Sequence, residues 1–439
     1  MTAAQGAQPK HTVAAKPPGG ALTRSNNTPL PASRLITGAQ WTTGRYDPPS
    51  NQWGDILPTV WSDDGSSYVL MDDGGVDVPL SGGFWRQSLA TITGKPPNLH
   101  FRRVAAASPP PKTWGQIAGN PDNDDGPLGP YYSTGFAEAG GVFYATQQRN
   151  WNWNANGAFA GLVGIAYSTD HGKTWSSPKN PFPAPLGNLS FVDGGGPGGA
   201  YPDGYMYAIG TEREFNASRL ILGRVKAGVA SVTDPSQWQW YAGSTRAGGK
   251  ASAQWTGSVA ATVPVLNWTN HITYPQMAYD PGLHRYLLTF TYSYSPSTPA
   301  VWKGGSQLVI AESPNPWGQF SFVAGSSYFG PSNGYGAGFP SQWISRDGRT
   351  LWLKWAANFD GCAKGLDCSG AYGFNVAQVR LTVKARAGKP KPKAAAPAAK
   401  QPHRMRKLLY VVSGLSLPLL LVLAVGRDGF LARLRRRPE

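Results

Sequence analysis

Acidic side chains recur where the sequence predicts strands to begin or to turn back, and their pairing suggests hydrolytic chemistry. The residues concerned are Asp55, Asp72, Asp73 and Glu212. Two carboxyl groups can cleave a glycosidic bond, because one protonates the departing oxygen while the other acts as base or nucleophile. In this interpretation Asp55 is the base or nucleophile and Glu212 is the general acid. Asp72 or Asp73 would position or tune that pair, since a neighbouring acid raises the pKa of a general acid.

Each of these acids also has a purely structural explanation. Asp72 and Asp73 precede two glycines and could form a turn. Asp55 could cap a strand start, and Glu212 could pair with its neighbour Arg213 at the surface, where an ion pair contributes little. The pattern alone leaves both interpretations open.

A second group of residues has the side chains that bind sugars. Trp151 and Trp153 alternate in the polar loop WNWNANG, where they are better placed to stack on sugar rings than to fill a core. The alternative for His271 is a packed histidine of the core. The alternative for Asp193 is a turn, because a glycine-rich stretch follows it. The predicted substrate-binding residues are Arg149, Trp151, Trp153, Asp193, His271 and Tyr292.

The elements that must position these side chains repeat along residues 35–383. The repeated unit is a strand, a Gly/Asp turn, an aromatic-rich strand, a long loop and a third strand. First strands are expected to begin near Asp55, Tyr131, Leu189, His271 and Phe339. Such spacing predicts an all-β fold, a five-bladed β-propeller, in which residues 35–41 supply the missing strand of the last unit.

Strand order in such a propeller would bring distant acids to one face. First-strand starts and the loops between second and third strands share that face, so Asp55, Asp73 and Glu212 are expected to converge there. The segment STDHGKTW, residues 168–175, is an Asp box. Its aspartate accepts backbone N–H groups in a turn, and its glycine permits a positive φ. We expect it to be structural and to lie on the opposite face; looser versions are SDDG at 62–65 and SRDGRT at 345–350.

Charge is concentrated outside the predicted propeller. The chain carries 40 Lys and Arg against 24 Asp and Glu, but 18 of the basic and 2 of the acidic residues lie in 1–34 and 384–439. The remaining 22 basic and 22 acidic residues make residues 35–383 neutral. A nucleic-acid-binding surface needs positive charge on the fold itself, so this class of function is disfavoured.

The two ends of the chain differ from the middle. Residues 1–34 are expected to be disordered, and 384–407 form a Pro/Ala/Lys-rich linker. Residues 408–426 are nineteen uncharged residues, the length of a transmembrane helix, and a basic tail follows at 427–439. Arg and Lys flank both ends of that helix, so the positive-inside rule does not orient it. Cys362 and Cys368, with five residues between them, favour a local disulfide over two free thiols.

Several stretches together resemble a family of actinobacterial secreted propellers that includes endo-D-arabinanases. They include WSDDGSSYVLMDDGG, YYSTGFAEAGGVFYA, GIAYSTDHGKTWSSP, PQMAYDPGLHRYLLT and FPSQWISRDGRTLWL, and they extend over nearly all of 53–383. The resemblance implies that the acidic first-blade segments of the family match Asp55, Asp72 and Asp73, and that its third-blade loop matches Glu212.

The expected function is therefore a glycoside hydrolase acting on a cell-wall polysaccharide such as an arabinan-like glycan. The alternative is a non-catalytic glycan-binding propeller. In both cases the chain would be held at the cell membrane by its single helix, with the propeller outside the cytoplasm. The chemistry requires no cofactor or metal ion, although it is compatible with a structural Ca²⁺.

Overall fold

The computed structural model describes most of residues 21–384. Its larger gaps are 25–27, 46–50, 78–83, 105–115, 118–130, 151–158, 294–305, 330–332 and 358–371, and a few single or paired residues between these are also left out. The predicted N-terminal segment lies mostly outside the described residues. The linker, the transmembrane helix, the basic tail, Cys362 and Cys368 lie wholly outside them.

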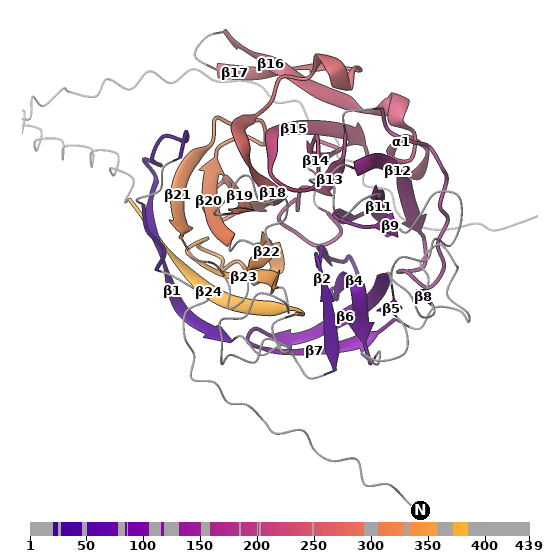
Figure 1. The fold of residues 1–439 in the computed structure, drawn as a ribbon. Coiled ribbons are helices and arrows are strands. Elements are labelled where there is room, and N and C mark those ends of the chain that lie inside the picture. Colours follow the sequence, from indigo (N-terminus) through magenta and orange to yellow (C-terminus); the bar gives the residue numbers. More distant parts are fainter. Residues whose placement is uncertain are drawn as a thin grey trace, which may run out of the picture. The chain divides into compact units, whose positions relative to one another are not determined.

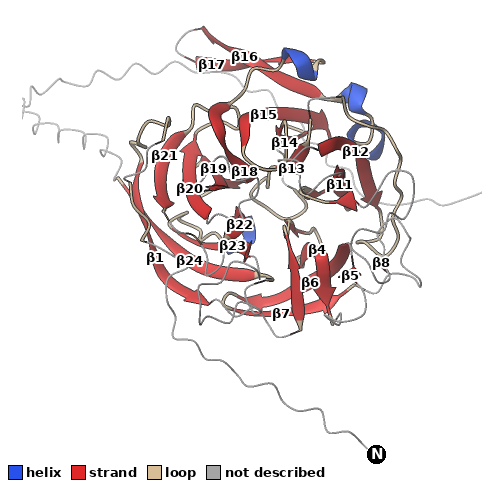
Figure 2. Ribbon diagram, viewed as in Figure 1, coloured by secondary structure: helices blue, strands red, loops and turns tan. Residues whose placement is uncertain are grey.

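Antiparallel strands make up almost all of the described secondary structure (Figure 2). The first sheet contains β2 (Gln52–Asp55), β3 (Thr59–Trp61), β4 (Ser67–Val76), β6 (Gln87–Lys95) and β7 (Asn98–Arg103). The second contains β9 (Tyr131–Tyr132), β10 (Phe136–Ala139), β11 (Val142–Asn150) and β12 (Phe159–Ser168). A small sheet pairs β5 (Phe84–Trp85) with β8 (Gln116–Ile117).

A nine-stranded sheet holds two successive meanders. The first is β13 (Asn188–Phe191), β14 (Tyr205–Thr211) and β15 (Ala217–Lys226), with the hairpin β16 (Gln239–Ala247) and β17 (Lys250–Thr256) beside it. The second is β18 (Leu266–Asp280), β19 (Arg285–Ser293), β20 (Ser306–Ser313) and β21 (Ser321–Ser326). The described helices are all a single turn: α1 (Val229–Val232), η2 (Pro235–Gln237), η3 (Val259–Ala261) and η4 (Ser341–Trp343).

The last sheet joins the two ends of the folded unit. It contains β22 (Gly334–Gly338), β23 (Thr350–Ala357), β24 (Asn375–Val383) and β1 (Ile36–Arg45). β1 pairs with β24 from Ile36 opposite Val383 to Arg45 opposite Val376, which confirms that the segment beginning at residue 35 completes the final sheet. Within this unit the sheets are arranged around a common centre (Figure 1), the arrangement of a β-propeller.

Hydrophobic side chains are packed between neighbouring meanders. One cluster joins the β2–β7 sheet to the β10–β12 sheet through Tyr68, Leu70 and Phe143. Further clusters join β10–β12 to β13–β15, β13–β15 to β18–β21, β18–β21 to β22–β24, and β22–β24 back to the first sheet. Because both faces of a meander are covered by its neighbours, strands such as β14 are buried along nearly their whole length.

The fifth repeated unit begins earlier than the sequence pattern indicated. Its first strand is β22, Gly334–Gly338, whereas residues 341–343 of the expected strand form the single turn η4. Pro340 explains the difference, because proline lacks the N–H that a central strand must donate.

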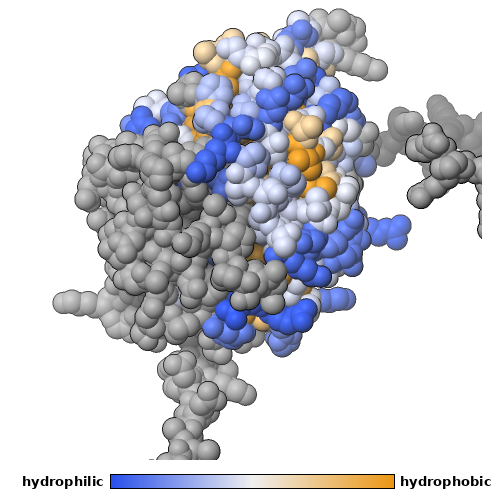
Figure 3. Space-filling model, turned by 90° about the vertical axis from the view of Figure 1, so that its right-hand side faces the viewer, coloured by the Kyte–Doolittle hydropathy of each residue, from blue (hydrophilic) through white to orange (hydrophobic). Residues whose placement is uncertain are grey.

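Polar residues dominate the side of the molecule shown in Figure 3, with only scattered hydrophobic residues among them. Val263 is the one large hydrophobic side chain that is exposed among the described residues. Within the same residues, no helix is both long and apolar enough to cross a membrane.

Candidate functional site

Asp55 and Asp72 meet across the first two strands of the first sheet. They are register partners in the antiparallel pair of β2 and β4. The backbones are very close here, since a Cβ on Gly74 would lie 2.2 Å from the carbonyl oxygen of Trp53. Residues 72–75 are therefore part of a strand, and Gly74 is required by this close approach instead of by a turn.

Asp55 is tied to a residue 280 positions away. The hydroxyl of Tyr335, on β22, donates to Oδ2 of Asp55 at 2.8 Å. The backbone after Asp55 is unusual, because Ile56 and Leu57 have φ values of 58° and 56°. A β-branched residue at positive φ is strained, and such strain is found mostly at functional sites.

A second carboxyl group, Glu214, is held in the same way. It lies in the segment between β14 and β15, is 1% exposed, and accepts a short hydrogen bond from the hydroxyl of Tyr274 on β18. The rings of Tyr274 and Tyr335 are 5.7 Å apart. We call Asp55, Glu214, Tyr274 and Tyr335 the tyrosine–carboxylate cluster; four separate strand regions bring it together.

Tyr274 stays protonated in this environment. Burial raises its pKa well above the ordinary value, and the negative charges of Glu214 and Asp55 raise it further. A phenol that keeps its proton is a hydrogen-bond donor at every pH at which the carboxylates are charged. The two tyrosine hydroxyls can therefore donate to two acids in one cluster, the buried Glu214 and the half-buried Asp55.

Asp72 contributes from below the surface. It is fully buried, and its Oδ2 accepts the backbone N–H of Ser133 at 2.9 Å. The Ser133 hydroxyl in turn accepts from the side-chain amide of Gln87 at 2.6 Å. Asp72 thus links the first sheet to the second.

Lys354 lies directly behind the same segments. It is 1% exposed, and its Nζ donates to the carbonyl oxygens of Gly336 at 2.8 Å and Ile56 at 3.3 Å. These carbonyls belong to the residues that follow Tyr335 and Asp55. Burial lowers the pKa of Lys354 to about 7.

A narrow cavity of about 30 Å³ lies at the centre of the unit, enough for one or two water molecules. Lys354 and Asp193 line it together with apolar residues. Each of the five repeated units supplies a strand residue to its wall, among them Thr59, Phe136, Phe191, Met277 and Gly338. The cavity therefore marks the central channel of the propeller.

Glu212 is placed differently from its near neighbour Glu214. Its carboxylate accepts the backbone N–H groups of Ser218 at 2.6 Å and Arg219 at 3.1 Å, across the β14–β15 connection. It therefore closes a local loop and does not join the tyrosine–carboxylate cluster. The predicted ion pair with Arg213 is not among the salt bridges of the described residues.

Two predicted substrate-binding residues, His271 and Tyr292, have rings in contact with each other. The ring of His271 lies 4.6 Å from Trp268 at an interplanar angle of 7°, and 4.7 Å from Tyr292. The Tyr292 hydroxyl donates to Gln307 at 3.0 Å. These rings form an aromatic group on the β18–β19 hairpin, separate from the carboxyl groups.

Asp193 lies toward the other end of the strands. It forms a bridge with Ala278, four residues beyond Tyr274 on β18. Its Oδ2 accepts the N–H of Ser341 at 2.9 Å, and burial raises its pKa. Of the remaining predictions, Trp151 and Trp153 lie outside the described residues, as do the side chains of Asp73 and Arg149.

The Asp box has the predicted turn structure. Asp170 accepts the N–H and the hydroxyl of Thr174 at 2.9 and 2.7 Å, and Trp175 donates from its indole to the Gly172 carbonyl at 3.0 Å. The box follows the end of β12 that is remote from Asn150, hence remote from the Asp55 end of the sheets.

Sequence reasoning missed three members of this site: Tyr274, Tyr335 and Lys354. Glu214 was also missed, since its near neighbour Glu212 was chosen as the acid of this loop. A lysine within the apolar strand TLWLKWAAN was the one available signal, because lysine is rarely fully buried.

No family model matches the chain, and no curated protein sequence does. Solved structures similar to it include an α-L-arabinofuranosidase from Podospora anserina, at 10% identity, 80% of this chain, 99% of that chain and a TM-score of 0.41. A family 43 glycoside hydrolase from Xanthomonas citri is 12% identical, with 78% of this chain and 92% of that chain covered and a TM-score of 0.42. A family 93 α-L-arabinofuranosidase of Fusarium graminearum is 11% identical, with 77% of this chain and 96% of that chain covered and a TM-score of 0.35. These structural neighbours are glycoside hydrolases; at such scores the chemistry of this chain has to be argued from its own residues.

Proposed function

We propose that this protein is a glycoside hydrolase whose two reacting carboxyl groups are Asp55 and Glu214. The observation that supports it most is the tyrosine–carboxylate cluster, in which two acids from distant strands are held beside two facing tyrosines. Burying carboxyl groups is costly, so acids held together in this way are candidates for a chemical role.

The surroundings of the two acids suggest their roles. Glu214 is almost fully buried and accepts a hydrogen bond from Tyr274, and we assign it the role of general acid. Asp55 is half-buried at the end of β2, where it can reach a water molecule or an anomeric carbon as base or nucleophile. Tyr335 and Tyr274 orient the two groups by donating to them.

The substrate proposed is a furanose polymer of the arabinan type in a cell wall, with endo-D-arabinan cleavage as the specific activity. Support comes from the family resemblance of residues 53–383 and from the near-neutral charge of the folded part, which suits an uncharged glycan. Attachment to a membrane through residues 408–426, with the propeller outside the cytoplasm, belongs to the same proposal.

We also infer that the propeller has five blades. Hydrophobic clusters between successive meanders form a closed series, and each of the five repeated units contributes to the central cavity. Within the nine-stranded sheet, the β13–β15 and β18–β21 meanders would be two blades whose edges pair through β15 and β18.

A non-catalytic glycan-binding propeller is the second candidate. The stacked rings of Trp268 and His271 favour it, because a partly exposed aromatic face binds the apolar face of a sugar without any acid. The two candidates differ in whether bound glycan is cut.

Purified protein incubated with arabinans, arabinogalactan and pyranose polysaccharides tests the proposal, with products separated by chromatography. Release of oligosaccharides from the arabinans, absent in the Asp55→Asn variant, is the expected result. Binding of an arabinan without any product in the wild type would replace the hydrolase by the glycan-binding module.

A further inference from the structure

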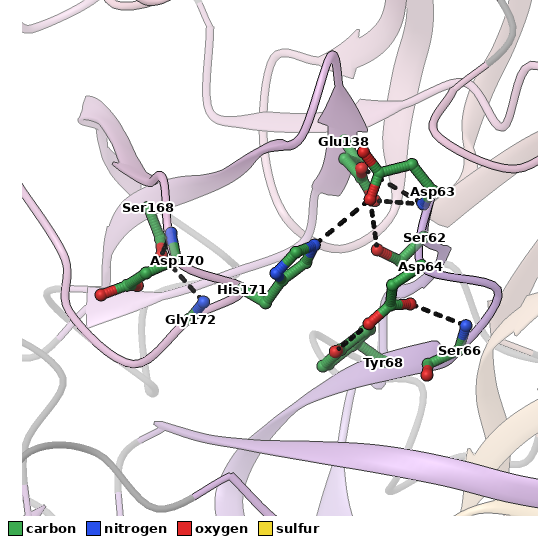
Figure 4. A network of polar contacts seen from close by, with 10 residues as sticks. All are labelled: Ser62, Asp63, Asp64, Ser66, Tyr68, Glu138, Ser168, Asp170, His171 and Gly172. Carbon is green, nitrogen blue, oxygen red and sulfur yellow. Dashed lines mark hydrogen bonds and ion pairs between the residues drawn. The ribbon is translucent and has the colours of Figure 1, made fainter.

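A second cluster of polar side chains lies at the other end of the first two sheets, away from the proposed reaction (Figure 4). It consists of Asp63, Glu138 and His171, which we call the histidine–carboxylate cluster. One donor atom from each lies within 4.8 Å of those of the others, and Nε2 of His171 is 3.2 Å from Oδ1 of Asp63. No step of the proposed hydrolysis uses these residues.

Three different elements hold the cluster in place. Asp63 is in the turn between β3 and β4, Glu138 is on β10, and His171 is in the Asp box. The backbone N–H of Asp63 donates to both oxygens of Glu138, at 3.3 and 3.2 Å. The imidazole stacks on Tyr68 at 6.2 Å and 13°, and Phe143 meets its edge. The donor atoms are therefore oriented before any ligand arrives.

The charge of the cluster is not balanced by the protein. Glu138 is 0% exposed and lies beside the carboxylate of Asp63, and Asp64 adds a further carboxylate nearby. Among the described residues, His171 is the only basic side chain that forms an ion pair with this group. Buried carboxylates are normally paired with a cation or coordinate a metal ion, so a bound cation would complete this cluster.

Solvent can still reach the donors. The side chains of His171 and Asp63 keep 35% and 49% of their surface exposed. An ion can therefore enter from outside. Figure 4 shows His171 reaching from the Asp-box turn toward Asp63 and Glu138.

We propose that Asp63, Glu138 and His171 bind a divalent transition-metal ion of the zinc class. One imidazole nitrogen with carboxylate oxygens is a donor set that zinc accepts. Calcium prefers six to eight oxygen ligands, and a set of one nitrogen and two carboxylates does not supply them. The ion would join the β3–β4 turn of the first sheet to β10 and the Asp box of the second, and thus stabilise that junction.

The alternative to a metal ion in this cluster is a proton on Glu138. Glu138 could be neutral and share a hydrogen bond with Asp63, which would remove the excess charge without any ion. Both explanations predict a cluster that is stable as a fold, but only one predicts a saturable, histidine-dependent response to metal.

The test is titration of the full chain, freed of metal by a chelator, with ZnCl₂ and separately with CaCl₂, followed by calorimetry and thermal unfolding. One zinc site per chain is expected, with Tm raised by roughly 3–6 °C at a hundredfold excess over Kd. Calcium should give a much smaller shift.

Variants assign the response to these residues. His171→Gln and Asp63→Asn should each weaken zinc binding by at least about tenfold, whereas His100→Gln, an exposed histidine on β7, should leave it unchanged. Glu138→Gln should lose the zinc response yet unfold at the same or a higher temperature than the wild type in chelator, since it removes an unbalanced buried charge. No zinc-dependent shift in the wild type, or an undiminished shift in both His171→Gln and Asp63→Asn, overturns the proposal.

Discussion

The two carboxylate clusters of this molecule sit at opposite ends of one strand, β4, and differ in their partners. At one end Asp72 is opposite Asp55, and at the other Ser67 is opposite Trp61, two residues before Asp63. The tyrosine–carboxylate cluster surrounds its acids with phenols that keep their protons. The histidine–carboxylate cluster surrounds its acids with an imidazole and backbone N–H groups.

This difference separates two uses of the same side chain. A tyrosine hydroxyl fixes one oxygen of a carboxyl group but brings no positive charge, so the acid can still exchange a proton with a substrate. An imidazole and a carboxylate can bind the same metal ion, and the carboxylate then has a structural role. The comparison predicts that substitutions at one end affect turnover, and those at the other affect metal-dependent stability.

Replacing Asp55 by Asn should have the largest effect. Loss of a base or nucleophile is expected to lower glycan cleavage by about 10²–10⁴-fold. The zinc-dependent rise in Tm should be the same as in the wild type, because Asp63 lies at the far end of β4. Rates of product release and thermal unfolding with and without zinc measure both, and a loss of the zinc response in Asp55→Asn would break the separation of the two clusters.

Replacing Tyr335 by Phe should have a smaller effect on the same reaction. The substitution removes the donor to Asp55 but leaves the ring that faces Tyr274. Leaving a buried acceptor unsatisfied costs about 1–3 kcal/mol, which corresponds to roughly 10–100-fold in rate if orientation of Asp55 is what the hydroxyl supplies. A change in KM alone, with kcat intact, would assign Tyr335 to sugar binding instead.

Lys354, beside the Asp55 end of the sheets, predicts a pH dependence of the free energy of unfolding. Its pKa is about 7 in the folded protein and about 10.5 when unfolded, so the unfolded chain binds more protons between these values. The contribution of Lys354 to the free energy of unfolding should therefore rise with pH from about 7 to 10.5, by up to about 1.4 kcal/mol per pH unit. Below pH 7 this contribution should not change with pH. Urea unfolding at pH 6, 7.5 and 9 checks this, and Lys354→Met should remove the rise.

Replacing Asp170 by Asn should have the smallest effect. It weakens the bonds that Asp170 accepts from Thr174 in an exposed turn, at a cost of about 1 kcal/mol in the free energy of unfolding. Because His171 follows directly, zinc affinity should fall modestly while glycan cleavage by the folded protein stays unchanged. Denaturant unfolding and the cleavage assay together distinguish this from any catalytic contribution.

The repeated strand pattern was predictable because alternation, turns and the Asp box are local signals. The strands predicted near Leu189 and His271 are present as β13 and β18, and the strand beginning at Ile36 pairs with β24 as expected. The hairpin β16–β17 and the early start of β22 were not foreseen, since glycine-rich and polar strands carry little periodicity.

The site was only partly predictable. Asp55 and Asp72 were recognised, but the choice between Glu212 and Glu214 depends on how the chain turns between β14 and β15. There Asn216 adopts a positive φ of 47°, Glu212 bonds back to the following strand, and Glu214 is left pointing to Tyr274. Such a choice is decided by tertiary contacts with β18, which no local pattern encodes.

The most direct measurement is therefore a comparison of Glu214→Gln with Glu212→Gln in the arabinan cleavage assay. The two variants remove the same charge two residues apart, so each controls for the other. We predict that Glu214→Gln loses at least about 10²-fold in product release, while Glu212→Gln keeps activity within a few-fold and loses some stability. Full activity in Glu214→Gln, with or without a loss in Glu212→Gln, would contradict the assignment of the tyrosine–carboxylate cluster as the reacting centre.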